Sequence, residues 1–161
     1  MRPEVLLERA GLPKVEPRSL AGGDVGVVWR CGDVVVKTRV PTLPGLFVAE
    51  AAGLRRLAAA GARVPEVLHA DEDGIVLSWL EPGPPDAERL GRSIARLHQD
   101  RSGSYGSADP LWLGAVPLPA GETDDPTEAL VELRLRPLLR RAAPALGTGA
   151  TDVERALERL R

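Results

Sequence analysis

The chain has 161 residues, of which 43% are hydrophobic and 27% charged, and its formal net charge is -2 at pH 7. This balance is typical of a soluble globular protein with one core and part of a second, and it lacks the basic excess that nucleic-acid binding requires. The charged first residues exclude a signal peptide, no stretch approaches the about 20 apolar residues of a membrane span, and a lone cysteine excludes an internal disulfide. We therefore expect a cytoplasmic protein that contacts neither nucleic acid nor membrane.

The first half of the chain predicts an antiparallel meander interrupted by one helix. A short amphipathic helix is expected over 4–10, between Pro3 and Gly11, which are typical start and stop residues. Alternating apolar residues with Gly and Asp turns between them then predict five strands and a longer helix. The strands are expected at 18–21, 25–31, 34–38, 64–70 and 74–80, and the helix at 46–60.

The second half is expected to be mainly helical. The Pro- and Gly-rich linker 81–85 marks the best domain boundary, which divides the chain into 1–81 and 82–161. Helices are predicted at 86–99, at 126–142 and from Thr151 onward, with a Gly-, Ser- and Pro-rich loop over 101–122. A capping box from Thr151 to Glu154 is expected to open the last helix, whose pattern continues to Arg161 without a stop signal.

One lysine and one glutamate are predicted to be partners. Lys37 lies in a very apolar strand, and it is one of only two lysines in the chain, with Lys14. In the helix that follows, Glu50 falls on the same stripe as Phe47 and Leu54, so it faces the core. Because an unpaired buried charge costs several kcal/mol, the two side chains should meet, either as a structural salt bridge or as part of a functional site.

Two further signals surround this pair. The turn Gly22-Gly23-Asp24 lets backbone amides approach an anion, although glycines between strands also serve simple hairpins. The strand that ends at Ser78 to Leu80 runs directly into the linker, where a kinase hinge would read adenine through its backbone. Hairpin, lysine strand and helix with an inward Glu occur in the order found in the nucleotide lobe of protein-kinase-like enzymes.

The chain also resembles the fructosamine (ketosamine) kinase family, from about residue 20 to 143. The first stretches that carry the resemblance also fit aminoglycoside phosphotransferases and choline-kinase-like enzymes, whereas the last two favour ketosamine kinases. The stretches are LAGGDVGVVWR, VVVKT, FVAEAAGLRRLAAAG with RVPEVL, LSWLEPG, LGRSIARLHQ, and YGSADPLWLGAVPLP followed by ALVELRLRPLLRRA.

The resemblance implies a fold and a set of roles. The fold is α+β, a protein-kinase-like N-lobe with a five-stranded antiparallel sheet plus one helix, followed by the first helices of a helical C-lobe. The activity implied is ATP- and Mg²⁺-dependent phosphorylation of a ketosamine hydroxyl. The nucleotide-binding residues implied are Lys37 for the phosphates, Glu50 as its partner, Gly22, Gly23 and Asp24 as the phosphate loop, and Ser78 and Leu80 in the adenine hinge.

The chain departs from the family in its catalytic machinery. The family uses a later loop of the form HGDxxxxN and a second Asp that binds magnesium. His98-Gln99-Asp100 is only superficially similar, and the chain contains no asparagine at all. We therefore expect no catalytic residue and no metal ligand here, and we interpret the chain as an N-terminal portion that is inactive alone.

Two other functions stay open at the level of sequence. One is an aminoglycoside phosphotransferase-like kinase, which substrate profiling would distinguish. The other is a stand-alone nucleotide-binding or interaction module without activity. Other conspicuous residues have plain structural interpretations: His69 and His98 as ordinary strand and helix-end residues, the arginines of 134–141 as a solvated helix face, and the three tryptophans as packing residues.

Overall fold

The computed structural model describes residues 1–21, 25–99 and 103–160. The chain forms two compact units, Met1–Asp100 and Arg101–Arg161. Each unit is described by itself. The sequence predicted the boundary at the 81–85 linker, and this boundary stays a prediction. The helix after the linker, α3 (Ala87–Leu97), is grouped with the first unit, yet none of its residues is buried.

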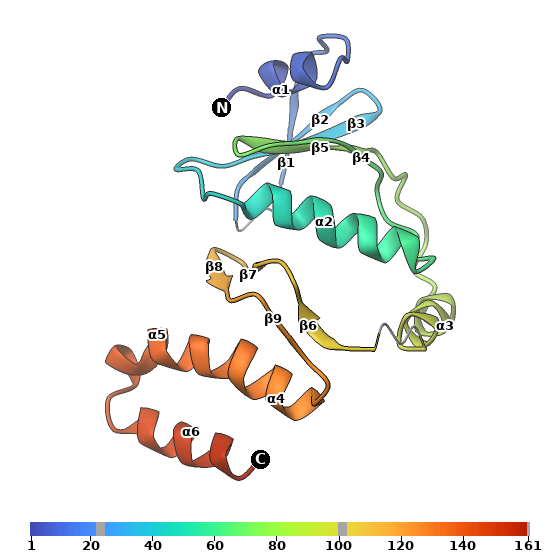
Figure 1. Ribbon diagram of the computed structural model, residues 1–161. Coiled ribbons are helices and arrows are strands. Elements are labelled where there is room, and N and C mark those ends of the chain that lie inside the picture. Colours follow the sequence, from blue (N-terminus) through green and yellow to red (C-terminus); the bar gives the residue numbers. More distant parts are fainter. Residues whose placement is uncertain (22–24, 100–102, 161) are drawn as a thin grey trace. The chain divides into compact units, whose positions relative to one another are not determined.

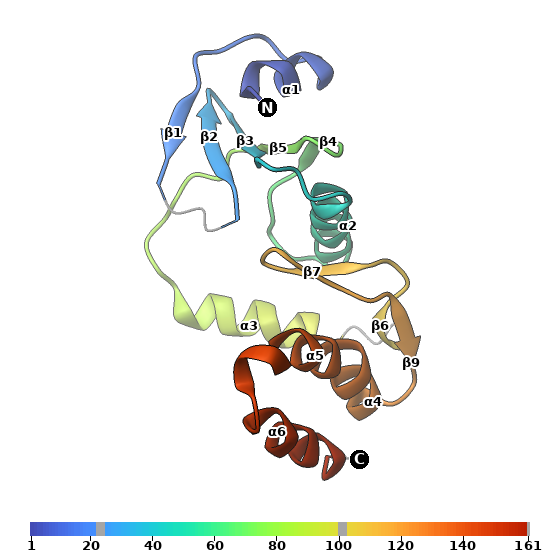
Figure 2. The same ribbon diagram turned by 90° about the vertical axis from the view of Figure 1, so that its left-hand side faces the viewer.

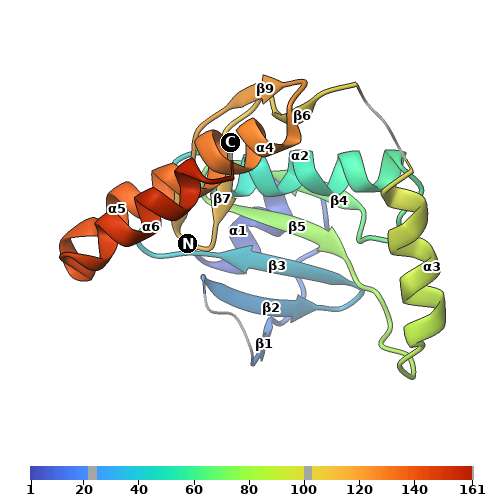
Figure 3. The same cartoon turned by 90° about the horizontal axis from the view of Figure 1, so that it is seen from below.

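Unit 1 is built on a five-stranded sheet with the order β1-β2-β3-β5-β4 (Figure 3). Every neighbouring pair is antiparallel, which confirms the predicted five-stranded antiparallel sheet. Valine-rich runs favour these strands because branched side chains pack well on a pleated surface. The strands are β1 (Arg18–Leu20), β2 (Val27–Cys31), β3 (Val34–Thr38), β4 (Val67–Ala70) and β5 (Gly74–Ser78).

Two helices cover opposite faces of this sheet (Figure 1). The first, α1 (Pro3–Arg9), buries Leu6 and Leu7 completely against Val36 and Val76. Cys31 completes this core, as a small strand residue with a pKa that burial raises. Alternate residues of β3 face the other helix, so Val36 packs under α1 while its neighbour Lys37 points the opposite way.

The second helix, α2 (Leu46–Ala59), is anchored by its first turns. Leu46, Phe47 and Ala51 are buried. The predicted inward stripe does not continue to its end, because Leu57 is 41% exposed. The first half of α2 is therefore the part that the sheet holds in place, and Glu50 lies in this half.

Unit 2 contains strands where the sequence predicted only a loop over 101–122. Two antiparallel pairs lie there: β6 (Tyr105–Ser107) with β9 (Gly121–Thr123), and β7 (Leu111–Leu113) with β8 (Val116–Leu118). Glycine permits the first pair, because a Cβ on Gly106 would lie 2.2 Å from the carbonyl oxygen of Gly121. Such three-residue strands are too short to show a clear alternating pattern.

The rest of unit 2 is helical, as predicted. A run from 126 to 146 consists of α4 (Pro126–Leu130), a π-helical segment η1 (Val131–Leu135) and α5 (Arg136–Leu146). The last helix, α6 (Gly149–Glu158), lies beside α5 (Figure 2) and shares a core with it. The predicted capping box is wrong: α6 begins before Thr151, and its N-cap, Thr148, makes no side-chain cap.

Candidate functional site

The predicted pair of Lys37 and Glu50 is present on the α2 face of the sheet. Lys37 Nζ donates to Glu50 Oε1 at 2.5 Å, and the two side chains are 32% and 29% exposed. The pair is thus half-buried rather than fully enclosed, so solvent and a ligand can both reach it. Such a cation can bind an anion on its open side while the carboxylate limits its rotamers.

The backbone around Lys37 explains how the side chain is placed. Lys37 pairs with Val28 on β2 and with Ile75 on β5, in the middle of the sheet. Ile75 is fully buried, and as the cross-strand partner of Lys37 it lies on the same face of the sheet. Because both neighbouring strands fix the backbone of Lys37, the face of the sheet on which its side chain lies is fixed too.

The predicted phosphate loop, Gly22, Gly23 and Asp24, lies outside the described residues. The residues that follow it are well held: a guanidinium N–H of Arg39 donates to the carbonyl of Val25. Gly26 passes so close to β3 that a Cβ there would lie 2.4 Å from the carbonyl oxygen of Thr38. This contact excludes any larger residue at Gly26.

Where the chain leaves β5 and enters the predicted hinge, several polar groups already have hydrogen-bond partners. Ser78 exchanges two bonds with Glu66: its N–H donates to the Glu66 carbonyl, and its hydroxyl accepts from the Glu66 N–H, both at 2.9 Å. The N–H of Trp79 donates to the carbonyl of Asp33 at 2.8 Å. No hydrogen bond to the backbone of Leu80 occurs among the residues that the structure describes, and this residue is 36% exposed.

The indole of Trp79 is fixed on two sides. The Arg30 guanidinium lies 4.1 Å from the ring centroid, and the ring N–H donates to Glu81 Oε2 at 2.8 Å. Trp79 therefore packs locally, as the sequence suggested for the tryptophans, and it stiffens the start of the linker.

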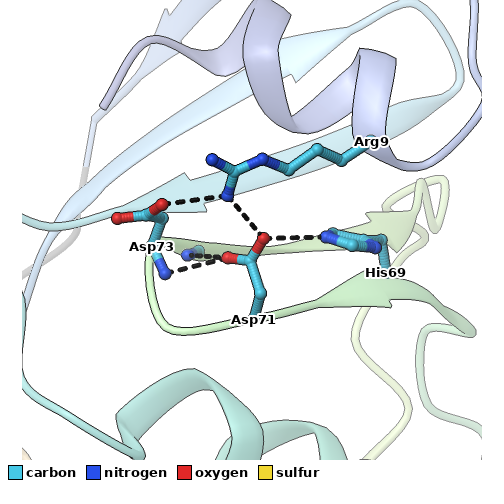
Figure 4. A network of polar contacts seen from close by, with 5 residues as sticks. Arg9, His69, Asp71 and Asp73 are labelled. Carbon is cyan, nitrogen blue, oxygen red and sulfur yellow. Dashed lines mark hydrogen bonds and ion pairs between the residues drawn. The ribbon is translucent and has the colours of Figure 1, made fainter.

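A polar cluster at the turn between β4 and β5 was not predicted as a site (Figure 4). Arg9 of α1 donates to Asp71 at 2.7 Å and to Asp73 at 2.9 Å, and His69 Nε2 lies 3.0 Å from Asp71. Burial alone would raise the pKa of Asp71. Hydrogen bonds from His69, Arg9 and the N–H groups of Asp73 and Gly74 outweigh burial and lower this pKa to about 2.

The lowered pKa predicts an acid-dependent loss of stability. A carboxyl whose folded pKa lies below its unfolded value stabilises the fold above the unfolded pKa, and the gain disappears as the pH falls through the folded pKa. Asp71 should therefore contribute on the order of 2 kcal/mol at pH 7 that is lost between about pH 4 and pH 2. Urea unfolding at these pH values would show this part of the pH dependence, and Asp71→Asn should remove it.

Asp33→Asn is the matched control, because Asp33 is exposed. It should leave the pH dependence as in the unaltered chain. An Asp71→Asn variant that keeps the same slope between pH 4 and pH 2 would contradict the assignment.

The arginine-rich helix of unit 2 is not only a solvated face. Arg140 and Arg141 are exposed as predicted, but the Arg136 side chain is only 15% exposed and contacts Glu132, Glu154 and Glu158. These ion pairs hold α5 to α6. The structural interpretation of His98 agrees with its position as the C-cap of α3.

The described residues contain neither a cluster of metal-ligating side chains nor a helix that could cross a membrane. Within 1–21, 25–99 and 103–160, no three His, Cys, Asp or Glu side chains gather as a metal-ligand set. In the same ranges, no helix combines the length and the apolar composition needed to cross a membrane. The candidate site in the described residues is therefore the half-buried ion pair of Lys37 and Glu50.

Comparison with known proteins identifies relatives along nearly the whole chain. The family model for fructosamine kinase matches residues 7–161. A probable ketoamine kinase of Thermus thermophilus is 49% identical over 140 residues, which are 86% of this chain and 53% of that protein. Another, from Enterococcus faecium, is 30% identical over 105 residues, which are 60% of this chain and 38% of that protein. The chain spans about half the length of these curated relatives or less.

Solved structures share the fold. A candidate fructosamine-3-kinase from Thermobifida fusca superposes with a TM-score of 0.84 at 28% identity, covering 98% of this chain and 60% of that one. A second, from Haemophilus somnus, has a TM-score of 0.73 at 23% identity, covering 90% and 54%. The similarity confirms the predicted α+β kinase-like fold.

Proposed function

The chain belongs to the fructosamine kinase family, and from this premise we propose that it is the nucleotide-holding part of an ATP-dependent kinase that phosphorylates a ketosamine hydroxyl. The observation that carries the proposal is the 2.5 Å contact between Lys37 and Glu50 on a sheet of this family's fold. The names of both curated relatives support a ketoamine acceptor rather than an aminoglycoside.

In this proposal Lys37 neutralises phosphate charge. Its side chain is 32% exposed, its backbone is paired on both sides in β3, and its ammonium group donates a hydrogen bond to Glu50. In phosphoryl transfer, positioning and charge neutralisation supply most of the rate enhancement. The predicted phosphate loop, Gly22, Gly23 and Asp24, would bind the same phosphates through backbone amides.

The hinge would hold adenine through the backbone. Because the N–H groups of Ser78 and Trp79 already have carbonyl partners, we assign the donor for the adenine ring to the N–H of Leu80. Ser78 would contribute through its carbonyl oxygen. The contacts of the Trp79 ring with Arg30 and Glu81 would hold the hinge backbone in place when the nucleotide binds.

The ligands that bind magnesium, and the catalytic base, would be residues other than those described. The metal, once bound with the nucleotide, would neutralise charge on the phosphates. The described residues contain no group of three or more His, Cys, Asp or Glu side chains that could hold a metal, and the role proposed for them is to bind and orient the nucleotide.

The proposal is tested by a transfer assay with radiolabelled ATP and a fructosamine, using the protein produced from its complete reading frame. We expect phosphorylation of the fructosamine and none of an aminoglycoside. In parallel, calorimetric titration of the 161-residue chain with Mg-ATP should show weak binding, since half of the nucleotide cleft would be missing. Transfer to the aminoglycoside alone, or to neither acceptor, would contradict the proposal.

A further inference from the structure

The turn that joins β4 to β5 is fixed from inside and outside. Asp71 Oδ1 accepts from the N–H groups of Asp73 at 2.8 Å and Gly74 at 3.2 Å, and the Asp71 N–H donates to the Gly74 carbonyl at 3.0 Å. In addition, Arg9 of α1 donates hydrogen bonds to the carboxylates of Asp71 and Asp73 (Figure 4). The backbone on each side of Glu72 is therefore held in place.

Glu72, at the tip of this turn, contacts the start of α2. Its Oε2 accepts from the N–H of Gly45 at 2.7 Å, across 27 positions in sequence. Gly45 is the N-cap of α2 in the left-handed conformation, with φ of 81°, and α2 has neither a side-chain cap nor an acidic residue in its first turn. The carboxylate of Glu72 thus supplies the negative charge that the positive end of a helix dipole favours.

The first turns of α2 transmit this contact to Glu50. Leu46 and Phe47 are buried, and the N–H of Ala49 donates to the carbonyl of Gly45 at 2.9 Å. The segment from Gly45 to Glu50 is therefore one continuous helical piece. A displacement of its first residue moves the Glu50 carboxylate relative to Lys37, which β3 holds independently.

We propose that Glu72 is a positioning residue, which holds the N-terminal end of α2 on the β4–β5 turn and so sets the contact of Glu50 with Lys37. A chain of contacts then runs from Arg9 through the turn to the pair that we assign to the phosphates. The relevance to nucleotide binding rests on the proposed function, whereas the contact of Glu72 with Gly45 and its effect on the pair concern the chain without nucleotide.

The two lysines of the chain allow a direct test. The Lys14 side chain is 67% exposed and forms an ion pair with the exposed Glu8, so it serves as an internal reference for the reactivity of Lys37 toward an acetylating reagent, read by mass spectrometry. Glu72→Ala should raise the ratio of Lys37 to Lys14 labelling by about threefold or more, because the pair opens more often when α2 is released. Glu50→Gln marks the ratio of an open pair.

Matched variants separate positioning from a general loss of stability. Glu16→Ala removes an exposed glutamate elsewhere in unit 1 and should leave the ratio unchanged. Glu72→Gln keeps an oxygen that accepts from Gly45 and should give an intermediate ratio. Arg9→Gln frees the turn and should change the ratio in the same direction as Glu72→Ala.

Amide hydrogen exchange of the segment 46–50 completes the test. Faster exchange together with a higher labelling ratio in Glu72→Ala supports the proposal. Faster exchange with an unchanged ratio means that Glu72 only caps the helix, and it overturns the positioning role; no change in either overturns the contact itself. A chain that binds no Mg-ATP would count against the proposed function without altering these outcomes.

Discussion

Replacing Lys37 by alanine is expected to lower ATP-dependent transfer to a fructosamine by about 10²-fold or more, the usual cost of removing one group that stabilises transferred charge. Lys37 is the only lysine in a strand of unit 1, since the other lysine, Lys14, lies in a loop. Its side chain is 32% exposed and pairs with Glu50. The measurement is kcat and KM for ATP in the protein from the complete reading frame.

Lys14→Ala is the natural control, because Lys14 is exposed in a loop and is the only other lysine. It should retain full activity. The Lys37 variant should also keep its fold, since the half-exposed side chain leaves no large cavity when truncated. Unchanged transfer in a folded Lys37→Ala protein would rule out the role assigned to this residue.

Replacing Leu6 by alanine is expected to destabilise unit 1 by about 3 kcal/mol, within the range for large-to-small changes in a core. Leu6 is 0% exposed and packs with Leu7, Val36 and Val76 between α1 and the sheet. Its loss removes apolar contacts and leaves a cavity that β3 and β5 cannot fill by moving, because each is paired on both sides. Urea unfolding followed by circular dichroism measures the change.

Leu90→Ala is the comparison for this result. Leu90 is 61% exposed on α3, and the same truncation there should cost well under 1 kcal/mol. Similar losses from both variants would mean that α1 does not form the core of unit 1 in solution. Because the chain has two units, unfolding should also be followed by tryptophan fluorescence, which reports Trp29 and Trp79 of unit 1 together with Trp112 of unit 2.

Much of unit 1 could be predicted because its signals are local. The valine run of β3 and the glycines after α1 and α2 each specify their own element, and the predicted bounds of β3 agree with the structure. The contact of Lys37 with Glu50 followed from two periodicities, the alternation of a strand and the stripe of a helix. The short strands of 101–122 were missed, because three residues are too few for a period to appear.

The β4–β5 cluster shows what local patterns leave out. Asp71, Glu72 and Asp73 look in the sequence like an ordinary polar turn. Their partners, Arg9 and Gly45, are separated from them by 62 and 27 positions, for Asp71 and Glu72 respectively. Nothing in the spacing of these residues predicts such contacts.

The sequence was enough to predict the family, the order of the strands and helices of unit 1, and the contact between Lys37 and Glu50, since these depend on motifs and on periodicities within single elements. Only the folded structure shows how far that pair is buried, that the N–H groups of Ser78 and Trp79 have carbonyl partners, and that Glu72 contacts the start of α2. The physical reason is that side-chain exposure and contacts between distant segments depend on how the elements pack, and packing is a property of the assembled sheet and helices rather than of any one segment.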